Sequence, residues 1–384
     1  MLLKTRFYLP PLREQSVFRA SLINKLNHSS GGQLIVVAAP AGYGKSTLVS
    51  QWLHHFPHTF AWLTLDSAHN TPLKFWRYII NALQGIQPGV GIEAKQLIEQ
   101  NHTYHLTDIV ISLLNDLDSL SSHNESTDAI SLVLDDFHLL ENRQLLGLVN
   151  LFLDHLPAGI RLVITSREEP PLALAKRRAN NQLVELTSKD LAFSFEESQQ
   201  FFSNAMGLDV AESTVTTLLK GTEGWVAGLQ LAALSLKSGS NSLEKRRTEE
   251  LVKHTGLDRH IEDYLFEEVF SRQTEEIKSF LVLTSVVPRF CAALANVLMN
   301  KQDCQSLIVR LEQANLFLVP LDNHRTWYRF HDLFRQFLLQ QFQQLAPDMM
   351  ANCHTRAAEW YEAFGYLEEA IEQRIINKQW KDAI

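Results

Sequence analysis

One short segment, residues 36–49, constrains the fold of this chain more than any other. An apolar run leads into a loop of small residues that ends in Gly44-Lys45-Ser46-Thr47, and an amphipathic helical pattern follows. This order predicts a buried strand, a phosphate-binding loop and a helix, because small residues let several backbone N–H groups converge on one anion. We expect the segment to bind a nucleoside triphosphate.

Two polar side chains of this loop have expected roles. Lys45 would reach the terminal phosphates as a mobile charge, and Ser46 would offer its hydroxyl to Mg²⁺ at the positive end of the following helix. The common pattern opens with Gly, whereas this chain has Ala39 there. A glycine-containing turn without a ligand is therefore the alternative. The residues predicted to line the nucleotide are Pro40, Ala41, Gly42, Tyr43, Gly44, Lys45, Ser46 and Thr47.

A second acidic site follows an apolar run at residues 132–134, where Asp135 and Asp136 stand in succession. In a phosphate-loop protein the first acid, Asp135, would sit beside Ser46 and hold Mg²⁺ through water. Asp136 would orient or deprotonate the attacking water. The alternative for such an acidic pair is a turn or a helix cap.

Another apolar run ends in Thr165-Ser166-Arg167, which places an arginine at the same edge of a parallel sheet. We predict that Arg167 contacts the γ-phosphate and reports its presence. The competing interpretation is an ion pair between Arg167 and a surface acid such as Glu168 or Glu169.

A segment near the N-terminus, residues 16–19, introduces a helical pattern ahead of the phosphate loop. Two of its residues, Val17 and Arg19, are candidates to lie against the base and ribose of the nucleotide. An ordinary capped surface helix explains the segment equally well.

Size and charge exclude several classes of protein. The 384 residues suffice for two or three domains, and 45% hydrophobic residues are ordinary for a globular chain. A net charge of −8 argues against a chain that is mainly a nucleic-acid-binding surface. Three cysteines without metal-ligand spacing favour reduced thiols, and no apolar run reaches membrane-spanning length or resembles a signal peptide. We therefore expect a cytosolic protein that does not contact membranes.

The first half of the chain alternates strand and helix patterns, which predicts an α/β domain with a parallel sheet and helices on both faces. Ligands bind such sheets at the carboxyl ends of the strands, where the phosphate loop falls. The expected strands are residues 34–39, 60–65, 130–134, 161–165 and 183–186, and the expected helices are residues 45–54, 72–84, 106–120 and 143–155.

Strand patterns nearly vanish after residue 190, and the second half is predicted to be helical. Helical patterns occupy residues 211–219, 224–236 and 257–270, and residues 239–247 resemble an exposed connector with a basic triplet. Three further helices within 275–315 precede a hairpin formed by 316–321 and 326–330, the order of a winged-helix module, and a helix resumes at 331–343. We predict four domains: 1–190 (nucleotide-binding), 191–270 (helical), 271–345 (winged helix) and 346–384 (start of a helical repeat).

The last residues hold small and aromatic side chains at helical spacing, as in the opening of a helix-pair repeat. Because such repeats need neighbours to bury their faces, we expect the chain to be the N-terminal fragment of a longer protein.

Several motifs, taken together and in order, resemble one family over nearly the whole chain. The chain is similar to the signal-transduction ATPases with numerous domains (STAND), within the AAA+-related P-loop class, and most closely to MalT-like transcriptional activators of the large LuxR type. The matching segments are residues 40–48, 134–138, 165–167, 191–193, 224–231 and 328–334.

The resemblance implies roles for individual residues. Lys45 and Ser46 would bind phosphate and Mg²⁺, Asp135 would be the metal-side acid and Asp136 the catalytic acid. Arg167 would be the first sensor. His331, in a position that resembles the family's winged-helix His-Asp motif, would contact the β-phosphate of ADP; from the sequence alone, a helix cap or core residue is the alternative. Gly224-Trp225 replaces the Gly-x-Pro of related proteins, so we carry over no nucleotide contact there.

The resemblance also implies a mechanism. ADP would keep the protein closed, an inducer together with ATP would open it for self-association, and slow ATP hydrolysis would reset it. A small-molecule inducer and promoter DNA would bind C-terminal regions absent here. One alternative is an AAA+ remodelling ATPase with continuous turnover, and another is a STAND scaffold or effector in defence. A third is direct DNA binding by the winged-helix region, which the net negative charge of the chain disfavours.

Overall fold

The computed structural model describes residues 2–12, 16–27, 33–56, 59–99, 105–122, 130–238, 259–314, 316–322 and 324–377. The chain divides into two compact units, each described by itself below. The first unit comprises Met1–Ala39 and Tyr43–Leu191, and the second comprises Pro40–Gly42 and Ala192–Ile384. Three residues of the phosphate loop therefore belong to the second unit.

The first unit is built on a five-stranded parallel sheet with the strand order β2-β3-β4-β1-β5. All five strands coincide closely with the expected ones, because each is a largely apolar run too short for a helix. The strands are β1 (Leu34–Ala38), β2 (Phe60–Thr64), β3 (Ile130–Asp135), β4 (Ile160–Ser166) and β5 (Leu183–Leu186).

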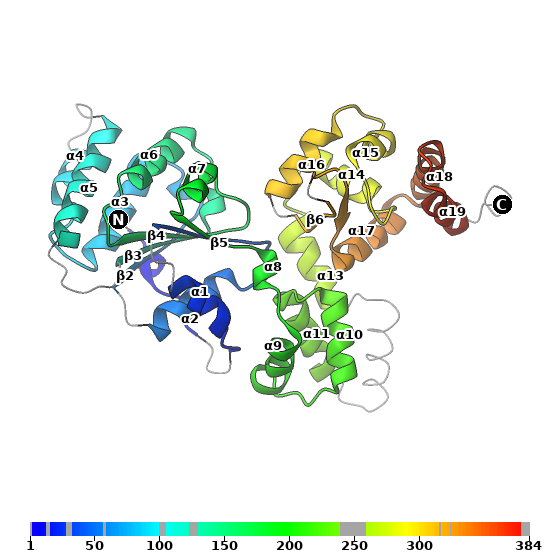
Figure 1. The fold of residues 1–384 in the computed structure, drawn as a ribbon, viewed down its shortest axis with the longest axis horizontal. Coiled ribbons are helices and arrows are strands. Elements are labelled where there is room, and N and C mark those ends of the chain that lie inside the picture. Colours follow the sequence, from blue (N-terminus) through cyan, green and yellow to red (C-terminus); the bar gives the residue numbers. More distant parts are fainter. Residues whose placement is uncertain are drawn as a thin grey trace. The chain divides into compact units, whose positions relative to one another are not determined.

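Helices cover both faces of this sheet (Figure 1). Val36, Leu63, Leu134 and Ile164 are register neighbours on one face, where they form an apolar core with side chains of α3, α5 and α6. Figure 1 shows α1 and α2 on the opposite face. The helices of this unit are α1 (Ala20–Asn27), α2 (Lys45–His55), α3 (Pro72–Gln84), α4 (Ile92–Glu99), α5 (Leu106–Ser122), α6 (Arg143–Asp154), α7 (Leu174–Ala179) and α8 (Ser188–Leu191), with 3₁₀ turns at Lys4–Phe7, Ser67–His69 and Phe137–Leu139.

The pairing register aligns the carboxyl ends of the central strands. Ala38 of β1 pairs with Ser166 of β4, and Thr64 of β2 pairs with Asp135 of β3. The phosphate loop, the acidic pair and Arg167 therefore leave the sheet at the same edge, as expected of a parallel α/β sheet.

Within the residues that the structure describes, the second unit is helical apart from one hairpin. An antiparallel pair, β6 (Leu318–Pro320) and β7 (Tyr328–Phe330), follows α14, α15 and α16, which confirms the predicted winged-helix order. The helices are α9 (Phe195–Gln200), α10 (Glu212–Thr222), α11 (Val226–Ser238), α13 (Arg259–Leu265), α14 (Glu275–Thr284), α15 (Ala292–Met299), α16 (Cys304–Gln313), α17 (Asp332–Leu345), α18 (Pro347–Ala363) and α19 (Leu367–Ile376), with π-helical turns at Phe201–Ala205 and Phe266–Phe270.

Some predictions differ from the structure in detail or fall outside it. Helix α11 begins at Val226 rather than 224, because Glu223 and Gly224 have φ angles of 48° and 75° and form a turn. The connector at 239–247 lies outside the described residues. None of the described helices is both long and apolar enough to cross a membrane. The division into four domains stays a prediction.

Candidate nucleotide site

The phosphate loop joins β1 to α2 through two glycines in the left-handed region. Gly42 has φ 80° and Gly44 has φ 75°, and Gly44 is the N-cap of α2. A Cβ on Gly44 would meet no atom within 4 Å, whereas a Cβ on Gly42 would lie 2.5 Å from the Cβ of Ala227 and 2.7 Å from Trp225 Nε1. Both positions favour glycine because of their left-handed backbone conformation, and at Gly42 a side chain would also clash with Ala227 and Trp225.

Lys45, the first residue of α2, is buried, with 8% of its surface exposed. Its Nζ donates a hydrogen bond to the carbonyl of Ala39 at 2.8 Å. Burial, together with the nearby positive charge of Arg167, lowers the pKa of Lys45 to about 8, against the opposing effect of Asp136 and Asp135. The ammonium therefore gains from an added negative charge, which a phosphate group supplies.

The second acidic site is assembled around Asp135, the last residue of β3. Its Oδ1 accepts hydrogen bonds from Ser46 Oγ at 2.6 Å and from Thr165 Oγ1 at 2.5 Å. Burial raises the pKa of Asp135, and the two hydroxyl bonds oppose that rise. The structure thus brings together the hydroxyl and the carboxylate that were predicted to hold Mg²⁺, in a donor set that this hard cation prefers.

Asp136 stands in the left-handed region, with φ 61°. Its backbone N–H donates to Thr165 Oγ1 at 3.1 Å, and its carboxylate lies 3.9 Å from His138 Nδ1. Thr165 therefore bridges the two acids, donating to one and accepting from the other. No role was predicted for Thr165 from the sequence, although its position as a polar residue at the buried end of β4 was an available signal.

The other predicted residues of this unit lie at different places. Arg167 directly follows β4 and is close enough to Lys45 to affect its pKa. The carbonyl of Val17 accepts a hydrogen bond from Gln51 Nε2 of α2 at 2.9 Å. Arg19 donates to the carbonyls of Leu191 at 2.7 Å and Asp190 at 3.2 Å, so its guanidinium has protein partners. The nucleotide contacts of Val17 and Arg19 stay predictions.

Within the second unit, a turn at residues 222–227 binds the tip of the phosphate loop. Trp225 Nε1 donates to the carbonyl of Ala41 at 2.9 Å, and the N–H of Ala227 donates to the carbonyl of Gly42 at 3.0 Å. Trp225 is fully buried. No contact was predicted for this tryptophan from the sequence, because the Gly-x-Pro motif of related proteins is replaced here.

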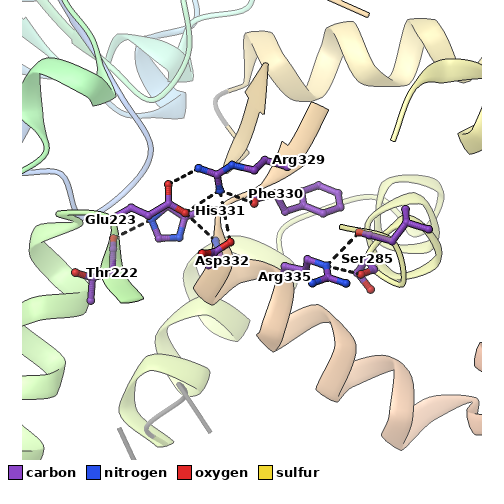
Figure 2. A network of polar contacts seen from close by, with 9 residues as sticks. Thr222, Glu223, Ser285, Arg329, Phe330, His331, Asp332 and Arg335 are labelled. Carbon is purple, nitrogen blue, oxygen red and sulfur yellow. Dashed lines mark hydrogen bonds and ion pairs between the residues drawn. The ribbon is translucent and has the colours of Figure 1, made fainter. Parts of the chain in front are cut away.

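The same turn also binds His331, the N-cap residue of α17 (Figure 2). The side chain is 3% exposed, and its Nε2 lies 2.8 Å from the carbonyl of Thr222. Among the described residues, His331 Nδ1 has no hydrogen-bond partner. The pKa of His331 lies below its usual value, chiefly because the ring is buried. The charge of Glu223, the hydrogen bond to Thr222 and the charge of Asp332 oppose this lowering, whereas the charge of Arg329 adds to it.

Glu223 and Arg329 form a two-bond ion pair beside this histidine. Arg329 donates to the two carboxylate oxygens of Glu223 at 2.8 and 2.7 Å. The N–H of Asp332 donates to Glu223 at 3.0 Å. Charge-assisted pairs of this shape fix both the distance and the plane of the partners.

The parallel sheet, the phosphate loop and the acidic strand place the first unit in the P-loop ATPase class of folds, here combined with a winged-helix module. Residues 266–350 match the family model of the MalT winged helix domain. A solved Walker-type ATPase of Pyrococcus abyssi shares the fold, with a TM-score of 0.57 and 16% identity over 87% of this chain and 99% of that chain.

Curated relatives share sequence with nearly the whole of this chain. The chain is 31% identical over 364 residues to the HTH-type transcriptional regulator MalT of Vibrio cholerae, and 32% identical over 377 residues to that of Yersinia enterocolitica. The matches cover 94% and 98% of this chain but 39% and 40% of the relatives. The chain is therefore a homologue of MalT regulators along almost all of its own length, and spans about two fifths of theirs.

Proposed function

We propose that this chain is the adenine-nucleotide-binding switch of a MalT-like, LuxR-type transcriptional regulator of the STAND class. The observation that carries the proposal is the convergence of Lys45, Ser46 and Asp135 at the carboxyl edge of the sheet. The match to MalT regulators supports the regulatory output.

The residues of the first unit would divide the work of binding and hydrolysis. Lys45 would exchange the carbonyl of Ala39 for phosphate oxygens, and Ser46 with Asp135 would hold Mg²⁺. When bound, Mg²⁺ neutralises charge on the phosphates. Asp136 would orient or deprotonate the attacking water, and Arg167 would bind the γ-phosphate.

A switch requires that its two states bind nucleotides with different affinities. Arg167 would supply a contact that only ATP makes. His331 would supply one that favours ADP, since its Nδ1 is a buried polar atom without a partner among the described residues. A carbonyl can only accept, so Nε2 carries the proton in the bond to Thr222, and a protonated Nδ1 would donate to a phosphate.

The remaining functions concern the whole regulator. We propose a cytoplasmic protein that self-associates in the ATP state. Promoter DNA and a small-molecule inducer would bind through regions of the longer relatives that this chain does not span.

The test is to denature the purified protein and identify released nucleotide by chromatography. We expect one ADP per chain in the wild-type protein and no nucleotide in Lys45→Ala. In His331→Ala we expect less bound ADP, or ATP in its place. His354→Ala is the matched control, because His354 is also a buried histidine of the second unit and binds Gln373. An empty protein with rapid ATP turnover that is indifferent to His331 would contradict the switch and favour a remodelling ATPase.

A further inference from the structure

We propose that Glu223 and Arg329 are positioning residues for His331, and that the turn at residues 222–227 couples the phosphate loop to that histidine. The nucleotide part of this inference rests on the function proposed above. No role for Glu223, Arg329 or Trp225 was expected from the sequence or its resemblance.

The turn makes contacts on two sides within the second unit. On one side, Trp225 and Ala227 bind the carbonyls of Ala41 and Gly42 in the phosphate loop. On the other side, the carbonyl of Thr222 binds His331 Nε2 and the carboxylate of Glu223 binds Arg329 and the N–H of Asp332. Four residues of this six-residue turn thus contact the tip of the phosphate loop on one side and the start of α17 on the other.

The conformation of the turn leaves it little freedom to relax on one side alone. Glu223 is a non-glycine residue with φ 48°, a conformation whose energetic cost the surrounding contacts must offset. A Cβ on Gly224 would lie 2.7 Å from the carbonyl oxygen of Phe193, so the backbone is packed closely there. A shift of Ala41 and Gly42 would therefore be passed to Thr222 and Glu223 through a short, tightly packed segment.

The winged-helix side is equally well anchored. The N–H of His331 donates to the carbonyl of Phe317 at 2.8 Å. One turn further along α17, Arg335 donates to the carbonyls of Ser285 at 2.9 Å and Val287 at 3.1 Å (Figure 2). The imidazole of His331 contacts the carbonyl of Thr222 through Nε2 and packs edge to face against the ring of Phe317, with 5.8 Å between the ring centroids. Because the backbone of His331 is held by its own domain, we infer that these two contacts and the neighbouring ion pair set the orientation of the ring.

The ion pair has a chemical effect as well as a geometric one. Burial lowers the pKa of His331, and the carboxylates of Glu223 and Asp332 oppose this by favouring its charged form, while Arg329 adds to the lowering. By binding Glu223 through two hydrogen bonds, Arg329 keeps that carboxylate beside the imidazole. A protonated His331 is the form that donates to phosphate through Nδ1.

The first experiment is a double-mutant cycle on ADP affinity, measured by calorimetry on nucleotide-stripped protein. We expect Arg329→Gln to weaken ADP about tenfold in the wild-type background, the order of effect of a charge-assisted pair. In the His331→Ala background, Arg329→Gln should change ADP affinity less than about twofold, because the histidine that Arg329 positions is absent. An equal loss in both backgrounds would mean that Arg329 acts independently of His331, and would overturn the proposal.

The matched control is Arg178→Gln, which removes another two-bond ion pair, with Glu185 at 2.8 and 2.7 Å in the first unit. It should leave ADP affinity unchanged in both backgrounds. Arg329→Lys keeps the charge but not the fork of donors, so we expect it to restore only part of the affinity.

A second measurement does not depend on the nucleotide. In protein labelled with ¹³C-histidine, the ring signal of His331 can be assigned by its loss in His331→Ala. Glu223→Gln and Trp225→Phe should both shift this signal in nucleotide-free protein, and Arg178→Gln should not. If the signal shifts while His331→Ala leaves ADP affinity unchanged, the positioning is real and the nucleotide role of His331 fails. An unmoved signal in both variants would refute the coupling itself.

Discussion

At the scale of single residues, the site combines groups whose protonation responds to burial. Lys45 is the clearest case, because its pKa of about 8 lies within an accessible range. A bound phosphate would raise this pKa, so nucleotide binding would favour the protonated amine.

We therefore predict that nucleotide affinity falls as the pH rises through 8. Below pH 8 the amine of Lys45 is already charged in the free protein. Above pH 8 this amine is mostly neutral and must take up a proton when the nucleotide binds. Between pH 7 and 9 the affinity should fall about tenfold, which isothermal titration calorimetry would measure. In Lys45→Arg the guanidinium stays charged throughout, so its affinity should be nearly constant over this range. A wild-type affinity that is flat across these pH values would contradict the assignment.

Thr165 gives a second prediction at this scale. Thr165→Val removes the hydroxyl that bridges Asp135 and Asp136 but keeps the shape of the side chain. We expect ATP hydrolysis to fall about tenfold with nucleotide affinity changed much less, because the acids lose their alignment while Lys45 is untouched. Phosphate release under single-turnover conditions measures this. Thr165→Ser should recover most of the rate; equal losses in both variants would point to packing instead.

At the scale of elements, the phosphate loop contains two glycines with the same backbone conformation and different surroundings. This contrast allows a matched pair of substitutions. Both Gly42→Ala and Gly44→Ala place a side chain in the left-handed region, at a cost of about 1–2 kcal/mol.

Only Gly42→Ala also meets Ala227 and Trp225, so we predict that it lowers the melting temperature further than Gly44→Ala does. The extra loss should be about 1–3 kcal/mol by denaturant titration. The same loss in both variants would mean that the loop tip is not packed against the turn at 222–227.

Particular elements also show what local pattern can and cannot predict. The five strands followed from short apolar runs, and α3 and α6 followed from helical periodicity. Helix α4 was not predicted, since it follows Gly89 and Gly91 and depends on tertiary contacts. Its Ala94 and Ile98 are buried in the core, and Asp116 of α5 accepts the N–H of Gly91 at 2.7 Å. Neither contact is visible in the local sequence.

At the scale of the whole molecule, the proposed switch predicts a change in assembly. With ADP we expect a monomer, and with a non-hydrolysable ATP analogue plus inducer we expect larger species in the full-length regulator. Light scattering coupled to size-exclusion chromatography measures both. Lys45→Ala should remain monomeric under all conditions, because it cannot hold the nucleotide. Assembly that is independent of nucleotide would contradict the switch.

The sequence by itself determined the strand–loop–helix order, the acidic strand and the helical second half with its hairpin. It did so because turn residues and hydrophobic periodicity act over a few neighbouring positions. It also placed Ser46 and Asp135 at one sheet edge, since parallel strands bring their carboxyl ends together. Only the tertiary structure decided the partners of Thr165, Trp225, Glu223 and Arg329. Those contacts join residues from 29 to 184 positions apart, and no local pattern specifies which polar side chains will meet once the chain is folded.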